Sequence, residues 1–266
     1  MSTTRPHPAT TDVRLRADAT APLQVVEAGT VPYASAWAWQ RELVERRRRE
    51  ESGDVLLLLE HPRVYTLGRR ASRGNVLFDD TELARRGIEV LDVDRGGDVT
   101  YHGPGQLVGY PVLRLAGVHG VVDYVRALEE VLLRALARLG VDAERSPGFT
   151  GVWVGDEKVA AIGVRVAAGG VTSHGFALNV SCDLDDFSGI VPCGISDRGV
   201  CSLASLGVPT TMAEVRATVA TAFAEVVGGR LEHRTIDALG LAAPSSATGL
   251  ARPGHAPGPD PRRSPQ

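Results

Sequence analysis

Three apolar runs, separated by only a few residues each, most constrain what this chain can fold into. Residues 152–154, 158–166 and 172–180 are strand-like, and residues 155–156 (Gly-Asp) and 168–170 (Ala-Gly-Gly) between them are typical of hairpin turns. Strands joined by turns this short run antiparallel to each other. The second half of the chain therefore predicts antiparallel strands rather than repeated strand-helix-strand units.

Helical patterns surround these runs. Apolar residues recur with helical spacing over residues 121–139, and Gly140 is suited to follow a helix end. Thr211 and Glu214 form a capping-box pattern ahead of a second helix, and Pro32 suits the start of a third. Helices alternate with strands only in the first half, so we predict one α/β (α+β) domain with a mixed β-sheet flanked by helices. Its further strands are expected at residues 23–27, 55–60, 88–93 and 107–115.

The two ends of the chain are expected to be disordered tails around one domain. Residues 1–22 show no periodicity, and residues 242–266 contain six prolines and three glycines. Such segments bury too little apolar surface to offset the entropy of ordering. The domain is accordingly predicted to span residues 23–241.

Charge and composition argue against several classes of protein. The formal net charge is −3 with a pI near 6.2, so no overall positive field favours nucleic acid. The longest aliphatic run covers residues 55–59, far short of the roughly 20 needed to span a membrane. No secretory signal is visible, and three cysteines outside any CxxC motif favour a reducing cytoplasm.

Lys158 is the single lysine among 29 basic residues. A coding bias toward arginine would leave few lysines anywhere in the chain. Alternatively, Lys158 serves where a titratable amine is required, because a guanidinium does not deprotonate in proteins. The count alone leaves both interpretations open.

Residues 95–106 (RGGDVTYHGPGQ) combine four glycines with Arg, Thr, Tyr, His and Gln. Glycines let a backbone approach a ligand closely, so this stretch predicts a ligand-binding loop rather than a plain connection. It matches neither a dinucleotide fingerprint nor a Walker A motif. His102 is the histidine expected in the site, whereas His174, in mid-strand, suits a structural or a site role equally. With His61, these histidines show no metal-ligand spacing, so we expect no metal.

The three cysteines differ in their prospects as a nucleophile, since the reactive form is the thiolate. Cys182 precedes three aspartates, which oppose that form. Cys201 precedes an apolar segment and is expected to be a small buried side chain. Cys193, between turn-forming residues and without an adjacent charge, is the leading candidate.

Five segments in this order resemble the lipoyl(octanoyl) transferases of the biotin and lipoate protein ligase superfamily. They are residues 60–62 (Glu-His-Pro), 65–68 (Tyr-Thr-Leu-Gly), 95–106, 158–163 (Lys-Val-Ala-Ala-Ile-Gly) and 190–194 (Ile-Val-Pro-Cys-Gly). The long glycine-rich motif is specific, and no departure is visible at the key positions. The resemblance covers roughly residues 25–240 and does not explain the proline-rich C-terminal extension.

This resemblance implies the superfamily's mixed sheet with flanking helices, and transfer of an octanoyl (or lipoyl) group in protein lipoylation. The donor would be octanoyl-acyl carrier protein. The acceptors would be lysines of the lipoyl domains of 2-oxoacid dehydrogenase complexes and of the glycine cleavage H protein. Because the acyl group arrives already activated, no ATP and no other cofactor is expected.

The resemblance also implies roles for individual residues. Cys193 matches the acyl-thioester nucleophile, and Lys158 matches the lysine that lowers the pKa of that thiol and moves protons. The substrate-binding positions that match are Arg95, Gly96, Gly97, Asp98, Val99, Thr100, Tyr101, His102, Ala161, Ile162, Gly163, Gly175, Phe176 and Ala177. The residue types suit this chemistry, and small side chains at Ala160, Ala161, Gly163 and Gly175 are expected to leave a slot for an eight-carbon chain.

Two alternatives remain from the sequence. An ATP-dependent lipoate-protein ligase shares the superfamily fold and needs no cysteine nucleophile, and a non-catalytic acyl- or carrier-protein-binding module needs neither Cys193 nor Lys158. Acyl carrier proteins are acidic, so an enzyme of this charge needs a local basic surface to bind one. Arg69, Arg70 and Arg73 form the nearest basic cluster, which suits either that surface or a solvated loop.

Overall fold

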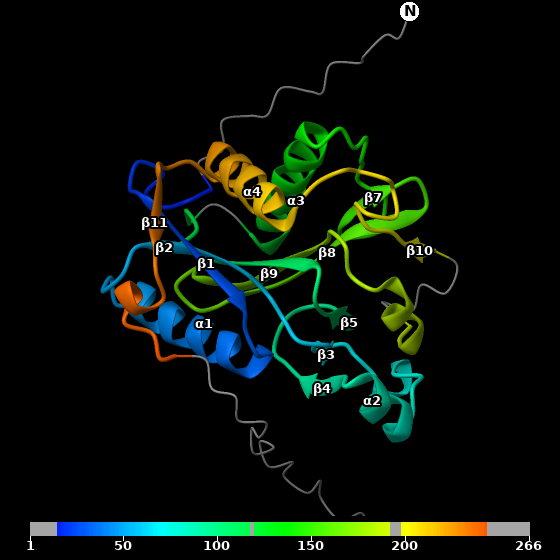
Figure 1. Cartoon of the computed structure of the whole chain (residues 1–266). Helices are drawn as coiled ribbons and strands as arrows, with labels where there is room; N and C mark the ends of the chain where they lie inside the picture. The colour runs from blue at the N-terminus through cyan, green and yellow to red at the C-terminus, as the bar shows by residue number, and fades with distance from the viewer. Residues whose placement is uncertain (1–14, 118–119, 192–197, 244–266) are drawn as a thin grey trace, which may run out of the picture.

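The computed structural model describes residues 15–117, 120–191 and 198–243. Helices α3 and α4 cover one face of a large mixed sheet and α1 covers the other, while α2 lies beside a small second sheet (Figure 1). The helices span Tyr33–Arg48 (α1), Asp80–Arg86 (α2), Val121–Arg138 (α3) and Met212–Val227 (α4). None of these helices within the described residues is both long and apolar enough to cross a membrane.

The main sheet has the strand order β10-β8-β9-β6-β2-β1-β11, with β7 paired to β8. Strands β7, β8 and β9 pair antiparallel through short turns, and β9 also pairs antiparallel with β6, whereas β1 pairs parallel with both β2 and β11. The mixed sheet and the antiparallel pairing of the three strands joined by short turns are therefore as predicted, whereas β10 and β11, also in the second half, pair parallel. The strands are Leu23–Thr30 (β1), Asp54–Glu60 (β2), Gln106–Val112 (β6), Val152–Val154 (β7), Glu157–Val166 (β8), Thr172–Asn179 (β9), Gly199–Val200 (β10) and Leu231–Arg234 (β11).

Strand β2 separates two hydrophobic cores. Leu56 and Leu58 face α3 and α4, whereas Leu57 and Leu59 pack on the side of α1, because alternate strand residues point to opposite faces. All four side chains are fully buried. The near-continuous apolar run in this strand thus reflects a sheet covered on both faces.

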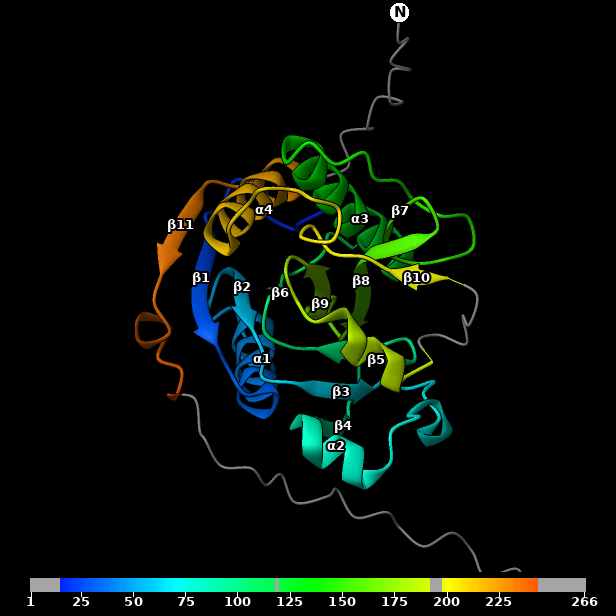
Figure 2. The same ribbon diagram turned by 45° about the vertical axis from the view of Figure 1, so that its right-hand side comes forward.

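A second sheet holds three strands in the order β4-β3-β5: Val64–Leu67 (β3), Glu89–Asp92 (β4) and Val99–His102 (β5). It lies under the β8 and β9 end of the main sheet (Figure 2). Strand β5 corrects one expectation, because the glycine-rich stretch is not a loop throughout. Its middle pairs antiparallel with β3, so Thr66 lies opposite Thr100. Side chains of β5 therefore alternate between two faces.

The sequence signals for helix ends are confirmed. Thr211 is the N-cap of α4, and its hydroxyl and the Glu214 carboxylate form the predicted capping box. Gly140 follows α3 with a φ of 77°, a left-handed conformation that suits glycine. Helix α2 and strands β3, β5, β10 and β11 were not expected, because each is short: none has more than seven residues, and the strands have four or fewer.

The expected domain boundary after residue 22 is wrong. Leu15 and Arg16 are buried, and the Arg16 guanidinium donates to the Asp54 carboxylate at 2.6 Å. Asp54 also accepts from Arg47 at 2.6 Å and from the backbone N–H of Arg114 at 2.9 Å. A buried carboxylate needs such partners, so the ordered domain begins by residue 15. Residues 1–14 and 244–266, also expected to be tails, lie outside the described residues.

We predict that Arg16→Ala lowers the free energy of unfolding by about 3 kcal/mol, because it removes a partner from a buried charge. Arg48→Ala serves as a matched control, since its pair with Glu45 is exposed and should cost under about 1 kcal/mol. Urea unfolding followed by circular dichroism measures both. Equal effects of the two substitutions would contradict a structural role for residues 15–22.

Candidate active site

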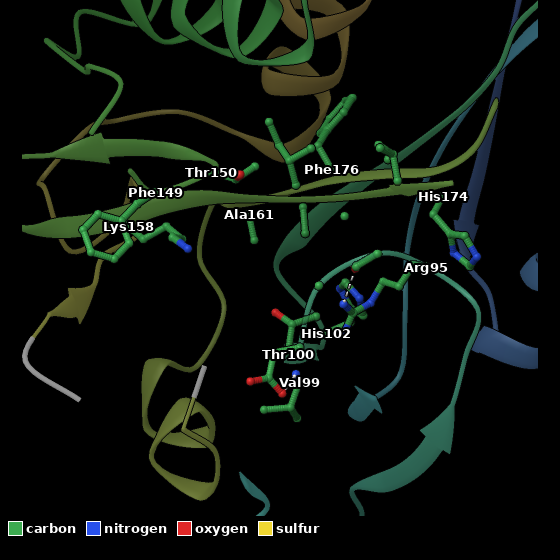
Figure 3. Close-up of a pocket in the computed structure, with 18 of the residues that line it drawn as sticks. Arg95, Val99, Thr100, His102, Phe149, Thr150, Lys158, Ala161, His174 and Phe176 are labelled. Atoms are coloured by element: carbon green, nitrogen blue, oxygen red, sulfur yellow. Dashed lines mark hydrogen bonds between the residues drawn. The ribbon is translucent and has the colours of Figure 1, made fainter. Parts of the chain in front are cut away.

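A pocket of about 460 Å³ opens between the main sheet and the small sheet. Figure 3 shows Lys158 and Phe149 at one end and His174 at the other, with Ala161 across the space from Thr100. The wall on the main sheet comes from β8 and β9, and the opposite wall comes from residues 95–100. The pocket is therefore long, which suits an extended ligand.

Most of the predicted site residues line this one pocket. They are Arg95, Gly96, Gly97, Asp98, Val99, Thr100, His102, Lys158, Ala161, Ile162, Gly163, Gly175, Phe176 and Ala177. Residues as far apart in sequence as Arg95 and Ala177 thus meet at one cavity. Tyr101 is the exception, because it points to the other face of β5, where its hydroxyl donates to Asp186 at 2.9 Å. Burial, together with Asp186, raises the pKa of that hydroxyl.

The pocket wall at residues 95–97 is held by backbone contacts and by one buried cation. The N–H of Gly96 donates to the carbonyl of Val164 in β8 at 2.9 Å. The Arg95 guanidinium donates to the carbonyl of Thr66 at 2.6 Å and to its hydroxyl at 2.9 Å. These bonds join the small sheet to the main sheet and close one side of the pocket.

The small residues of β8 and β9 only partly form the expected slot. Ala161 faces the pocket, but Ala160 is buried in the opposite core. A Cβ at Gly175 would lie 2.1 Å from the carbonyl oxygen of Gly109, and one at Gly163 would lie 3.1 Å from that of Gly96. At these glycines the missing side chain makes room for neighbouring backbone rather than for a ligand.

Lys158 is held against an aromatic platform. Its ammonium nitrogen lies 4.7 Å from the ring centroid of Trp153, a cation–π contact. The half-buried Arg198 guanidinium stacks on the same ring at 5.2 Å and on Phe149 at 4.7 Å. The pocket therefore ends in two cations and two aromatic rings.

A chain of buried amides sets the protonation of His102. The side-chain amide of Asn179 donates to the carbonyl of Cys201 at 2.9 Å, so its oxygen accepts from Gln106 at 3.0 Å. The Gln106 oxygen then accepts from Nδ1 of His102 at 2.8 Å. Burial, with the neighbouring His61 ring, keeps the pKa of His102 well below its usual value. His102 is thus neutral, with its proton assigned to Nδ1.

His174 closes the other end of the pocket. Its backbone has a φ of 55° in mid-strand, a conformation that is strained for a residue other than glycine. Nε2 donates to Asp94 at 2.8 Å, and Nδ1 lies 3.4 Å from the Tyr33 hydroxyl. Burial lowers the pKa of His174, while the hydrogen bond from His174 lowers that of Asp94 to about 2. A neutral histidine therefore donates to an ionised carboxylate here.

The predicted nucleophile, Cys193, lies outside the described residues. The segment that leads toward it is anchored: the N–H of Leu77 donates to the carbonyl of Gly189 at 2.8 Å, and that of Val191 donates to Asn75 at 2.9 Å. Phe187 before the gap and Arg198 after it both line the pocket.

The other two cysteines are poorly suited to nucleophilic attack. Cys182 and Cys201 are buried, and neither forms a disulfide within the described residues. Burial raises the pKa of the Cys182 thiol to about 12 and that of Cys201 to about 11. Cys201 belongs to the core, as the sequence indicated.

Several pocket residues were not predicted from the sequence, among them Tyr33, Phe149, Trp153, Asn179 and Arg198. Asn179 carried a usable signal, because an amide at the end of an apolar strand needs a buried partner. Phe149 and Arg198 stand in irregular segments, where no periodicity indicates which side chains point inward.

We predict that iodoacetamide leaves Cys182 and Cys201 unmodified in the native protein at pH 8. Their pKa values of about 12 and about 11 leave thiolate fractions on the order of 10⁻⁴ and 10⁻³ at that pH. Peptide mass spectrometry measures the labelling, with urea-unfolded protein as the fully reactive control. Rapid native labelling of either thiol would show that its surroundings open readily.

Curated relatives resemble the chain over most of its length. The octanoyltransferase of Gloeobacter violaceus is 50% identical over 216 residues, which cover 80% of this chain and 94% of the relative. The octanoyltransferase of Rubrobacter xylanophilus is 52% identical over 202 residues, covering 75% and 91%.

Solved structures share the fold. A bipartite lipoate protein ligase from Thermoplasma acidophilum has a TM-score of 0.64 at 20% identity, covering 83% of this chain and 90% of that one. Lipoate-protein ligase A bound with ATP has a TM-score of 0.64 at 18% identity, covering 84% and 92%. The family model of the lipoyl protein ligase A/B catalytic domain matches residues 32–224, and the chain accordingly belongs to that family.

Proposed function

We propose that this protein transfers an octanoyl group from acyl carrier protein to the lysine of lipoyl domains, through a thioester on Cys193. Relatives at about 50% identity, whose sequences it matches almost in full, carry the name octanoyltransferase. The acceptors are the lipoyl domains of 2-oxoacid dehydrogenase complexes and the glycine cleavage H protein. The reaction belongs in the cytoplasm, where a catalytic thiol stays reduced.

The shape and chemistry of the pocket suit an acyl chain. The half-buried Ala161 and Ile162 provide apolar wall, and the buried histidines add no charge near neutral pH. Each methylene removed from water contributes about 0.8 kcal/mol to binding. An eight-carbon chain laid along this pocket therefore supplies much of the substrate affinity.

The first half-reaction is a thioester exchange. The Cys193 thiolate attacks the carbonyl carbon of the donor thioester, a new carbon–sulfur bond forms, and the carrier's sulfur leaves and takes up a proton. The pocket-lining positions of Phe187 and Arg198, on either side of the segment holding Cys193, support placing that thiol at the pocket. The acyl-enzyme has an energy similar to that of the donor, so no ATP is consumed.

The second half-reaction forms the amide. The acceptor lysine's amine attacks the acyl-enzyme carbonyl, the carbon–sulfur bond breaks, and Cys193 leaves as a thiolate. The amine must lose a proton, which Lys158 accepts at Nζ in the proposed mechanism. The observation that carries this proposal is the place of the single lysine of the chain, at the end of the acyl-sized pocket and against Trp153.

Ligation driven by ATP is the alternative for this family. The likeness to lipoate ligases, at about 20% identity, extends to the fold alone. A ligase would form no enzyme thioester and would show no transfer from octanoyl-carrier protein without ATP. A non-catalytic binding module would show no transfer at all.

We predict that incubation with octanoyl-acyl carrier protein, without ATP, adds one octanoyl mass to the protein. Intact mass spectrometry should show that hydroxylamine removes it and that Cys193→Ala abolishes it, since a thioester requires the thiol. Cys182→Ala and Cys201→Ala are the matched controls and should keep the adduct. An adduct that forms in Cys193→Ala but not in Cys201→Ala would show that Cys201, rather than Cys193, carries the octanoyl group.

We predict that Lys158→Arg still forms acyl-enzyme but stalls transfer to the lipoyl domain. Arginine keeps the positive charge near the thiol but does not titrate, so the amine's proton has no acceptor. The loss should be about 10²–10⁴-fold in a single-turnover assay that starts from pre-formed acyl-enzyme. Lys158→Ala should impair both steps. A wild-type second step in Lys158→Arg would refute proton transfer to this lysine.

A further inference from the structure

Three arginines on one loop form a basic surface beside the pocket mouth. Arg69, Arg70 and Arg73, here called the arginine lip, are all exposed. Within the described part of the chain, no carboxylate pairs with any of them. Other exposed arginines do pair, including Arg48 with Glu45 and Arg138 with Glu225. The arginine lip is therefore an uncompensated cluster on a chain whose net charge is −3.

The carboxylates around this loop are engaged elsewhere. The Asp98 carboxylate accepts hydrogen bonds from the Asn75 side-chain amide at 3.0 and 2.9 Å and from the backbone N–H of Val99 at 2.7 Å. Asp186 pairs with Arg63 and Arg86, and Glu82 pairs with Arg85 and Arg86. Asp186 and Glu82 are thus paired with other arginines, whereas Asp98 is held by neutral donors and keeps its charge. The three guanidinium groups of the arginine lip still exceed this one carboxylate, so the surface stays positive.

The loop is fixed to the pocket wall. The backbone N–H of Arg69 donates to the carbonyl of Arg95 at 3.0 Å, and that of Arg70 donates to Gly97 at 3.1 Å. Arg70 itself lines the pocket, whereas Arg69 and Arg73 do not. One guanidinium is therefore at the pocket and two lie outside it. Leu77, 58% exposed, adds an apolar contact on the same loop.

We propose that the arginine lip binds the acyl donor, a carrier with an acidic surface that presents its thioester on a phosphodiester-linked arm. Arg70 is placed to contact the phosphodiester as the arm enters the pocket, and Arg69 and Arg73 face the carrier's carboxylates. Guanidinium groups bind phosphates and carboxylates in bidentate geometry. This inference rests on the proposed function and assigns one of its two substrates to a surface.

The charge of the arginine lip favours the donor over the acceptor. The acceptor's reacting group is a lysine ammonium in its resting state, and three uncompensated guanidinium groups repel it. The donor's arm carries a negative charge close to the thioester. The arginine lip therefore repels the acceptor's ammonium group and attracts the donor's negative arm, so it favours binding of the donor in the first half-reaction.

The test uses Arg69→Glu/Arg73→Glu, which spares the pocket residue Arg70. The matched control is Arg49→Glu/Arg230→Glu, an equal change of charge at exposed arginines that also lack a carboxylate partner and do not line the pocket. Formation of acyl-enzyme is measured in the full-length protein by rapid quench and intact mass. One donor is octanoyl-acyl carrier protein, and the other is octanoyl-N-acetylcysteamine, which lacks both carrier and phosphodiester.

We expect the Arg69→Glu/Arg73→Glu variant to be acylated by the carrier about tenfold or more slowly at low ionic strength, with the difference shrinking near 1 M salt. The small thioester should react at the wild-type rate, and pre-formed acyl-enzyme should pass its octanoyl group to a lipoyl domain normally. The control variant should match wild type throughout.

Three outcomes would overturn the inference. Unchanged acylation by the carrier would mean that the arginine lip is only a solvated loop. An equal loss with the small thioester would mean that the substitutions damage the pocket. A loss confined to the second half-reaction would assign the arginine lip to the acceptor. Failure of the wild-type protein to form any acyl-enzyme with either donor would instead reject the proposed function.

Discussion

The pocket depends on backbone-to-backbone contact between two sheets. Gly96 donates to the Val164 carbonyl, and a side chain at Gly96 or Gly163 would come within 3.1 Å of the opposite carbonyl oxygen. Gly68 allows the same approach from the small sheet, since its Cβ would lie 2.5 Å from the carbonyl oxygen of Gly97. Three segments meet at this point only because none of them carries a side chain there. The distance between the sheets, and so the width of the pocket, follows from this contact.

Polar groups around that contact are buried but satisfied. The amide chain through Asn179 and Gln106 assigns the tautomer of His102, and Asp94 orients His174. Burial lowers the pKa of His61 to about 4, so its imidazole is also neutral near pH 7. A wall of neutral imidazoles and tyrosines can lie beside a hydrocarbon chain at little electrostatic cost, whereas charged groups would have to be desolvated. Of the cations of the pocket, Arg95 is held by hydrogen bonds to Thr66, and Lys158 and Arg198 lie together at one end.

Much of this arrangement could be predicted from local pattern and from one resemblance. The helical stripe of α3, the capping box of α4 and the hairpins of β7 to β9 are local signals, and each is present. Strand β5 and the burial of Arg16 could not be predicted, because both depend on partners remote in sequence, Thr66 in β3 and Asp54 in β2. Tyr101 was expected to line the pocket and does not, for a related reason. The motif was interpreted as a continuous loop, but part of it is a strand, in which alternate side chains point to opposite faces.

The aromatic platform under Lys158 bears on a hazard that any enzyme of this proposed chemistry faces, acylation of itself. A thioester at the pocket would stand near a primary amine of the same chain, and amide formation there would be irreversible. Lys158 is the single lysine in the sequence, so the surface offers no other lysine amine to a stray octanoyl group. The face of Trp153 favours the ammonium form, so the neutral amine, which the proposed proton transfer needs and which alone could attack a carbonyl, is the minor form of Lys158. The same contact that orients the lysine therefore also protects it from becoming a product.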